Sequence, residues 1–114
     1  MKGLIVREPY ATLIVNGKKT WEIRKNPTKI RGRILIISQG KAIGSVELVD
    51  VIGPFTVEEL SEHFDKHQVD SNFLEEYSKG KLLYAWVLKN PHIFEKPISV
   101  KLKKGVQVWA NMGD

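Results

Sequence analysis

The segment GKKTWEIR, residues 17–24, holds the side chains of this sequence that are best suited to bind an anion or a nucleobase. Its arginine and lysines suit phosphate, and its one carboxylate, Glu22, is an acceptor for an amino group on a base. In a regular strand Glu22 and Arg24 share a face, so Lys19 joins them only from an irregular turn, which Gly17 permits. The segment predicts a nucleotide-binding site. The alternative is a salt-bridged surface strand, with less than about 1 kcal/mol per ion pair.

Positive and negative residues occupy different parts of the chain, whose net charge is +5. Residues 18–33 include Glu22 as their lone carboxylate, whereas residues 47–76 include Lys66 as their lone lysine or arginine. A surface with a positive side suits RNA or single-stranded nucleic acid, although a solvated basic surface has the same composition. The residues predicted to contact nucleic acid are Lys18, Lys19, Glu22, Arg24, Lys25, Arg31, Arg33 and Ser38.

Composition excludes several other classes of protein. The 114 residues predict one domain, 1–114, and the absence of cysteine excludes disulfides, thiolate catalysis and sulfur-bound zinc. No apolar run is long enough to span a bilayer and no signal peptide is present, so we expect a cytoplasmic protein.

His63 and His67 have a spacing that can hold zinc, but no third ligand is evident. We predict surface histidines, no metal and no cofactor; the oligomeric state stays open.

Local signals predict the first half of the fold. A short strand, 2–6, precedes a helix within 8–17, which has Pro9 in its first turn and Gly17 as its C-terminal cap. Strands follow at 19–24, 32–38 and 41–53, the last with a bulge at Gly44.

The second half begins with the clearest helix signal. Thr56 and Glu59 match a capping box, and Val57, Leu60 and Phe64 then form one apolar face. A second helix at 71–80 and strands at 82–88, 97–102 and 105–109 complete the chain. The whole predicts an α+β fold: a closed β-barrel of about six to seven strands with two to three short flanking helices.

The spacing Gly17, Lys19, Glu22 and Arg24 resembles the G-x-K-x-x-E-x-R signature of the ASCH domain family, a branch of the PUA-like superfamily. The resemblance extends over PYATLIVNGKKTWEIR, RGRILIIS, YAWVL and KPISVKLKKGVQVW, and is weakest over residues 47–80. It implies a PUA-like barrel with helices at one side and a cleft lined by the signature residues. It also implies binding of RNA.

The same resemblance keeps a hydrolase open as the alternative, because some ASCH members are enzymes. One branch hydrolyses N4-acetylcytidine with a lysine, a threonine and a glutamate. Lys19 matches that lysine, but Glu22 stands where the threonine is expected and Gln68 falls near the expected glutamate. A metal-independent ribonuclease would use Lys19 and Glu22 as acid and base, with Ser38 nearby. Whether the protein is an enzyme is therefore left undecided, and a protein-interaction module using the acidic residues of 56–80 is a third reading.

Aromatic residues near the signature have two readings. Trp21 and Tyr10 could stack on a base, as in single-strand binders. Trp21 alternates with Glu22, however, so core packing is the prediction for it, as it is for Trp86 and Trp109.

Overall fold

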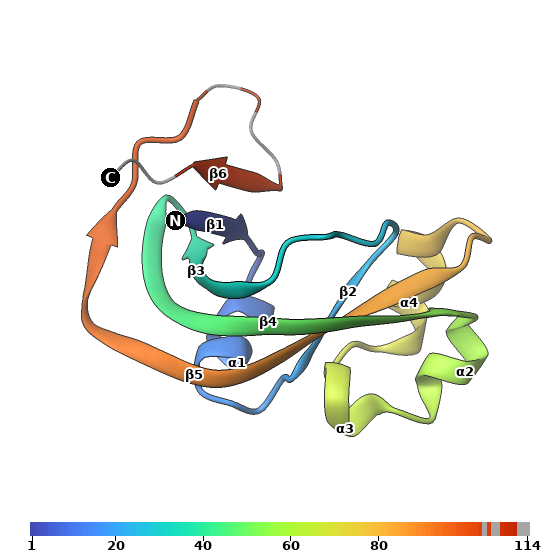
Figure 1. Ribbon diagram of the computed structural model, residues 1–114. Coiled ribbons are helices and arrows are strands. Elements are labelled where there is room, and N and C mark those ends of the chain that lie inside the picture. The colour runs from blue at the N-terminus through green and yellow to red at the C-terminus, as the bar shows by residue number, and fades with distance from the viewer. Residues whose placement is uncertain (104, 106–107, 112–114) are drawn as a thin grey trace.

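The computed structural model describes residues 1–103, 105 and 108–111, which form a curved sheet with short helices on one side (Figure 1). The strands are β1 (Lys2–Ile5), β2 (Trp21–Arg24), β3 (Gly32–Ser38), β4 (Lys41–Phe55), β5 (Leu83–Ser99) and β6 (Trp109–Asn111). The helices are α1 (Tyr10–Val15), α2 (Val57–Ser61), α3 (Phe64–His67) and α4 (Ser71–Ser78). The α+β class is confirmed. No helix in the described part of the chain is both long and apolar enough to cross a membrane.

The described strands form one six-stranded sheet in the order β2-β5-β4-β3-β1-β6. β1 runs parallel to β3, and the other neighbours are antiparallel. The predicted closure into a barrel is wrong for the described residues, because β2 and β6 are edges of an open sheet. These edges have only four and three residues, so little unpaired backbone is exposed without closure.

Several local predictions are confirmed. Gly17 follows α1 with φ +85°, a conformation that favours glycine. The predicted bulge occurs in β4, where the pairing with β5 shifts between Ala42 and Gly44. Thr56 and Glu59 form the predicted capping box at the start of α2.

Other boundaries differ from the prediction. The helix that begins at Val57 ends at Ser61 and a separate turn of helix starts at Phe64, whose side chain is therefore 51% exposed rather than part of the apolar face. Of the predicted strand 97–102, residues 97–99 are instead the end of β5 and residues 100–102 are in no strand, and the strand predicted at 105–109 is replaced by β6. Pro97 is tolerated because it lies between the paired residues Ile93 and Ile98, where the ladder is irregular. Val106 and Gln107, in the predicted 105–109 strand, lie outside the described residues.

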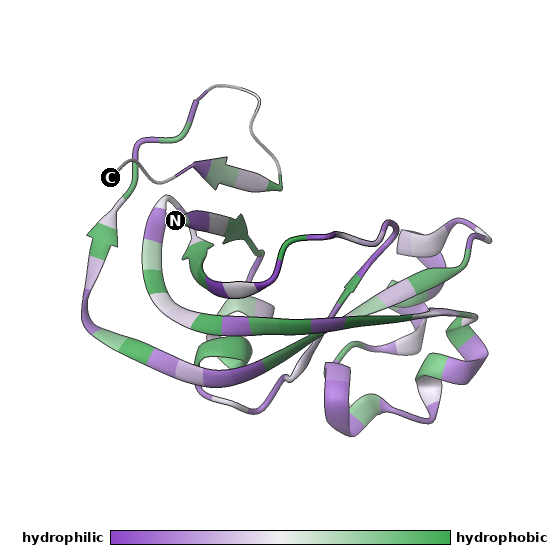
Figure 2. Ribbon diagram, in the orientation of Figure 1, coloured by the Kyte–Doolittle hydropathy of each residue, from purple (hydrophilic) through white to green (hydrophobic). Residues whose placement is uncertain are grey.

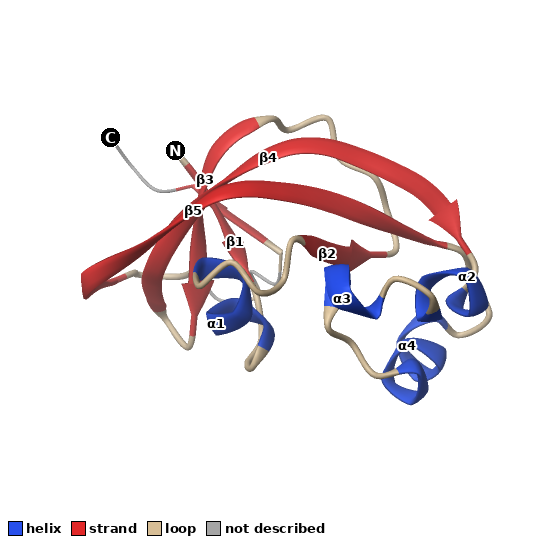
Figure 3. Cartoon of the chain, turned by 90° about the horizontal axis from the view of Figure 1, so that it is seen from below, coloured by secondary structure: helices blue, strands red, loops and turns tan. Residues whose placement is uncertain are grey.

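All the described helices lie on one side of the arched strands, with α1 under one half and α2, α3 and α4 under the other (Figure 3). Hydrophilic and hydrophobic bands alternate along β4 and β5, as expected for strands with one face on a core (Figure 2). One apolar cluster joins α1 to β1, β3, β4 and β5 and includes Leu4, Ile14, Ile36, Val46 and Trp86. A second joins β2 and β5 to α2 and α4 and includes Ile23, Leu60, Leu74 and Leu83. Tyr10 packs against both clusters, so it marks the junction between them.

Candidate functional site

The side chains of Lys19, Glu22 and Arg24 meet at the start of β2. Glu22 is 7% exposed, and its Oε1 lies 3.5 Å from Nζ of Lys19. Arg24 donates to Oε2 of Glu22 through Nε, at 2.9 Å, and its Nη2 lies 2.7 Å from the same oxygen. Lys19 lies in the turn before β2, and this position allows its side chain to meet those of Glu22 and Arg24. A buried carboxylate is thus held between two cations.

The Lys19 ammonium is enclosed by protein and is 1% exposed. It donates to the main-chain oxygens of Trp21, at 2.8 Å, and His67, at 2.5 Å. Together with Glu22 these contacts occupy its three donors, and the Tyr10 ring centroid lies 5.2 Å away. Burial lowers the pKa of Lys19, and the Glu22 charge opposes that shift.

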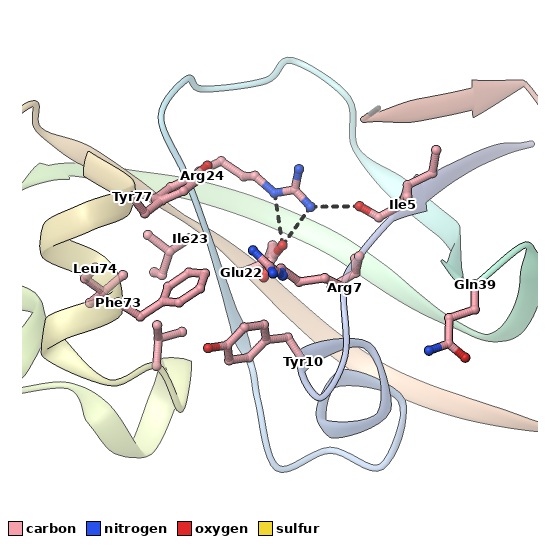
Figure 4. Close-up of a pocket in the computed structure, with 12 residues that line it drawn as sticks. Ile5, Arg7, Tyr10, Glu22, Ile23, Arg24, Gln39, Phe73, Leu74 and Tyr77 are labelled. Carbon is pink, nitrogen blue, oxygen red and sulfur yellow. Dashed lines mark hydrogen bonds and ion pairs between the residues drawn. The ribbon is translucent and has the colours of Figure 1, made fainter. Parts of the chain in front are cut away.

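A cavity of about 340 Å³ opens between β2, the start of α1 and α4 (Figure 4). Glu22 and Arg24 line it from β2, whereas Lys19 is not among its lining residues. Its other walls are mostly apolar or aromatic and come from Ile5, Val6, Tyr10, Ile23, Val69, Phe73, Leu74 and Tyr77, with Arg7 and Gln39 adding polar groups. Arg24 Nη2 also donates to the main-chain oxygen of Ile5 at 3.0 Å, so the guanidinium ties β2 to β1 across the cavity. The arrangement suits a flat ligand with a polar edge.

Two further cations lie against aromatic rings of α4. The Arg7 guanidinium carbon is 5.3 Å from the ring centroid of Phe73, and Nζ of Lys25 is 4.9 Å from that of Tyr77. The sequence had indicated Lys25, but it gave no reason to select Arg7. Phe73 and Tyr77 belong to the helix predicted at 71–80, for which no cavity was predicted, and both are half-buried and line the cavity. Helical periodicity identifies the face of a helix that points into the protein, but it does not tell whether that face meets a packed core or a cavity.

The tyrosines of the cavity remain neutral phenols at physiological pH. Burial raises the pKa of Tyr10, and the charges of Glu22 and Asp70 add to this effect while Arg7 opposes it. Burial likewise raises the pKa of Tyr77, where Glu22 acts in the same direction and Arg24 against it. Both hydroxyls therefore keep their hydrogens, and that of Tyr77 already has a hydrogen bond with the main chain of Lys25.

Ser38 belongs to a separate cluster at the end of β3. Its Oγ donates to Oε2 of Glu8 at 2.7 Å, and Thr12 donates to the same carboxylate through its hydroxyl and its main-chain nitrogen, each at 3.0 Å. Burial would raise the pKa of Glu8, but these three hydrogen bonds outweigh it and lower the pKa. Ser38 is not among the residues that line the cavity.

The remaining predicted contact residues lie away from the cavity lining. Lys18 is exposed beside the turn that leads into β2. Arg31 donates to the carbonyl oxygens of Thr28 and Ile30, both at 2.8 Å. Arg33 is paired with Glu47 at 3.2 Å and donates to Ser45 and to the carbonyl of Asn90. The structure thus brings together Lys19, Glu22 and Arg24, with Lys25 nearby, but it does not bring Arg31 or Arg33 to them.

The prediction of two surface histidines is wrong for His67, which is 0% exposed. One of its ring nitrogens contacts the carbonyl oxygen of Leu60 at 2.6 Å, and the other accepts from the main-chain nitrogen of Val69 at 2.9 Å. The ring can be buried because both of its nitrogens have main-chain partners. The polarity of the residues next to His67 in the sequence does not reveal these partners. His63 is half-buried and its ring lies 5.1 Å from that of Trp21.

The tryptophans pack within the protein. Trp21 stacks on Phe55, with centroids 5.8 Å apart, on the opposite side of β2 from Glu22. Trp86 is buried and stacks on the half-buried Trp109 at 5.7 Å. Their predicted role as packing residues is consistent with these contacts, and neither Trp21 nor Trp86 lines the cavity.

Comparison with known proteins gives one family. The family model of the ASCH domain matches residues 4–98. No curated protein matches the chain in sequence. The solved ASCH protein from Zymomonas mobilis has 24% identity and a TM-score of 0.74, covering 86% of this chain and 72% of that one. Its serine-to-alanine variant aligns at 21% identity and TM-score 0.81, covering 98% and 87%. Its tyrosine-to-phenylalanine variant has 24% identity and a TM-score of 0.74, covering 86% of this chain and 74% of that one. The TM-scores of these structures show a shared fold.

Proposed function

This chain belongs to the ASCH domain family, and we propose that it binds RNA or another single-stranded nucleic acid by admitting one unstacked base into the cavity beside Glu22. The observation that carries the proposal is a carboxylate, 7% exposed and held by two cations, in an otherwise largely apolar and aromatic cavity. A fixed negative acceptor in such a place selects a neutral aromatic ligand that presents donors.

The chemistry of the cavity fits an amino-bearing base. The carboxylate of Glu22 keeps lone pairs beyond those used by Arg24 and Lys19, and it accepts hydrogen bonds only. Adenine, cytosine and guanine carry amino donors, whereas uracil offers one ring N–H between two carbonyl oxygens that a carboxylate repels. Stacking on aromatic side chains adds about 1 to 3 kcal/mol per base. A cavity of about 340 Å³ lies at the lower end of the range for ligand sites, which suits one base rather than several.

The hydrolase alternative receives less support from the same geometry. A lysine that acts as a general base needs a neutral amine that reaches the substrate. The Lys19 ammonium instead uses its donors on two carbonyl oxygens and Glu22, and Lys19 does not line the cavity. Gln68 bonds to the carbonyl oxygens of Phe64 and Asp65 and is likewise not among the lining residues. These contacts favour binding over hydrolysis.

The test is a set of binding titrations with Glu22→Gln at two salt concentrations, using short single-stranded RNAs that differ in one central base. If Glu22 reads the base, the substitution weakens binding to the preferred RNA by about 1 to 3 kcal/mol and changes the others little. Glu58→Gln, an exposed carboxylate on α2, is the matched control. A uniform gain in affinity across all RNAs would show that the protein senses charge alone and would overturn the proposal.

The enzyme alternative is tested in the same samples. The protein is incubated with labelled RNA, with and without a chelator, and separately with N4-acetylcytidine. Cleavage that follows the protein through purification and disappears with Lys19→Ala would replace binding by ribonuclease activity. Formation of cytidine would establish an amidohydrolase. Unchanged substrates together with binding support the proposed function.

A further inference from the structure

We propose that Arg7 and Lys25 hold the two phosphates that flank the base in the cavity, so that the bound strand passes over the cavity from one cation to the other. The inference rests on the proposed function and extends it to the backbone of the ligand. It assigns a position to each phosphate, and it involves a residue, Arg7, that no motif selects.

Both cations are available to a ligand. Arg7 lies in the loop before α1, lines the cavity and is exposed (Figure 4). Lys25 follows the last residue of β2 and is also exposed. Neither side chain forms an ion pair with a carboxylate in the described part of the chain; each lies over an aromatic ring instead. A solvent-exposed cation over an aromatic ring is held by only about 0.5 to 1 kcal/mol, so a phosphate can compete for it.

The rings beneath these cations fix their relative placement. Phe73 and Tyr77 are four residues apart on α4 and stack with centroids 6.4 Å apart. Arg7 lies over the first ring and Lys25 over the second, so the two cations are separated along the direction of α4. A nucleotide within a strand carries one phosphate on its 5′ side and one on its 3′ side. Two separated cations, one lining the cavity and the other over the ring of the lining residue Tyr77, match that arrangement better than a single clustered anion site does.

Other arginines of the basic segment do not extend this track. Arg31 is bound to carbonyl oxygens of its own loop, and Arg33 is paired with Glu47. With two phosphate contacts, binding of single-stranded RNA should show a salt slope of about −1.4, from a contribution of about −0.7 per contact. A protein that used the whole stretch 18–33 as a track would have a much steeper slope.

The experiment measures affinities of the full chain for minimal probes by calorimetry. The probes are the nucleosides of adenine, cytosine and guanine, their 5′- and 3′-monophosphates and their 3′,5′-bisphosphates. We expect each phosphate to raise affinity about tenfold for the preferred base. Arg7→Gln should abolish the gain from one phosphate, and Lys25→Gln the gain from the other, with each gain measured against the affinity of the same variant for the nucleoside. Lys18→Gln, an exposed lysine outside the cavity lining, is the control and should leave every affinity unchanged.

The outcomes separate this inference from the proposed function. Phosphates that add no affinity, or a Lys18→Gln effect as large as the other two, would overturn the assignment of Arg7 and Lys25 while Glu22-dependent binding of RNA stands. Substitutions that weaken the nucleoside as much as the bisphosphate would also overturn it, because they would act on the shape of the cavity. If neither RNA nor any nucleoside binds, both proposals fail together.

Discussion

The side-chain ammonium of Lys19 lies 2.5 Å from the main-chain oxygen of His67, a residue 48 positions further along the chain. The same nitrogen donates to the carbonyl of Trp21 at 2.8 Å. One buried cation therefore fastens α3 to the beginning of β2 and at the same time faces the carboxylate of the cavity. Under the proposed function, fold stability and ligand recognition both depend on this group.

Replacement of Lys19 by methionine keeps a long unbranched side chain and removes its donors. We expect Lys19→Met to lower the free energy of unfolding by about 3 kcal/mol, because buried carbonyl oxygens lose their partner and Glu22 loses one of its two cations. Urea denaturation measures the change. Lys18→Met, at the exposed neighbouring position, should alter stability by less than about 0.5 kcal/mol. Equal effects at the two positions would contradict the structural role of Lys19.

Replacement of Arg24 by lysine keeps the charge but not the fork of donors. Arg24 contacts Glu22 through two nitrogens and also reaches the carbonyl of Ile5, and a lysine has no planar group that maintains all of these contacts. We expect Arg24→Lys to weaken RNA binding about tenfold, because Glu22 is no longer held in one orientation. Lys29→Arg, a reverse exchange at an exposed position, serves as the control. RNA affinity unchanged by Arg24→Lys would show that charge, and not geometry, positions Glu22.

His67 should make the stability of the protein fall as pH drops below about 7. Burial lowers its pKa below the usual 6.5; Lys19 and His63 act in the same direction, whereas the Leu60 carbonyl and Asp65 act against it. The folded ring donates to Leu60 and accepts from Val69, so a second proton would displace the Val69 N–H.

Below about pH 6.5 the unfolded chain therefore binds a proton that the folded chain does not, and stability falls as pH falls. Urea denaturation at pH 7.5 and pH 5.0 measures the loss, and His67→Gln should reduce it. Glu8 adds to the loss only at more acidic pH, because its pKa lies below 4.5. A pH dependence that persists unchanged in His67→Gln would assign it to other groups.

Gly44 is required by close packing and not by backbone conformation. A Cβ atom at this position would overlap the carbonyl oxygen of His92 and lie 2.8 Å from Cγ1 of Val15. Because a main-chain oxygen cannot move aside cheaply, we expect Gly44→Ala to destabilise the protein by about 3 kcal/mol. Gly80→Ala, where a Cβ meets open space but φ is +79°, should lose only about 1 kcal/mol from strain. Thermal denaturation of the two variants gives the comparison, and the reverse order of stability would refute this reading of the bulge.

Features that depend on neighbouring residues could be predicted from the sequence. The capping box at Thr56, the left-handed Gly17 and the bulge at Gly44 are all encoded within a few positions. The convergence of Lys19, Glu22 and Arg24 was also predictable, because strand alternation allows it only with Lys19 in the preceding turn.

Features that depend on distant partners could not be predicted. The His67 carbonyl accepts from the ammonium of Lys19, 48 positions away, and this contact helps to place the His67 ring beside its nearer main-chain partners, Leu60 and Val69. From the sequence, Arg33 was as good a candidate for a phosphate ligand as the other basic residues of 18–33. The register of β3 and β4 places it opposite Glu47, with which it forms an ion pair. Arg7 belongs to no motif of the sequence. It lies over the ring of Phe73 because the fold places α4 beside the loop before α1.

The helices α2, α3 and α4 are the connection between β4 and β5, whose pairing closes at Phe55 and Leu83. They supply one wall of the cavity through Val69, Phe73, Leu74 and Tyr77, while Glu22 and Arg24 belong to the sheet. The connection between β4 and β5 could therefore be exchanged without changing the residues that the sheet contributes to the cavity. A different insert between the same two strands would give a new wall, and thus a new preference for ligand shape, around an unchanged carboxylate. The graft would need an apolar face for Ile23, Leu83 and Ala85, and carbonyl oxygens for the ammonium of Lys19 and the main-chain nitrogen of Thr20.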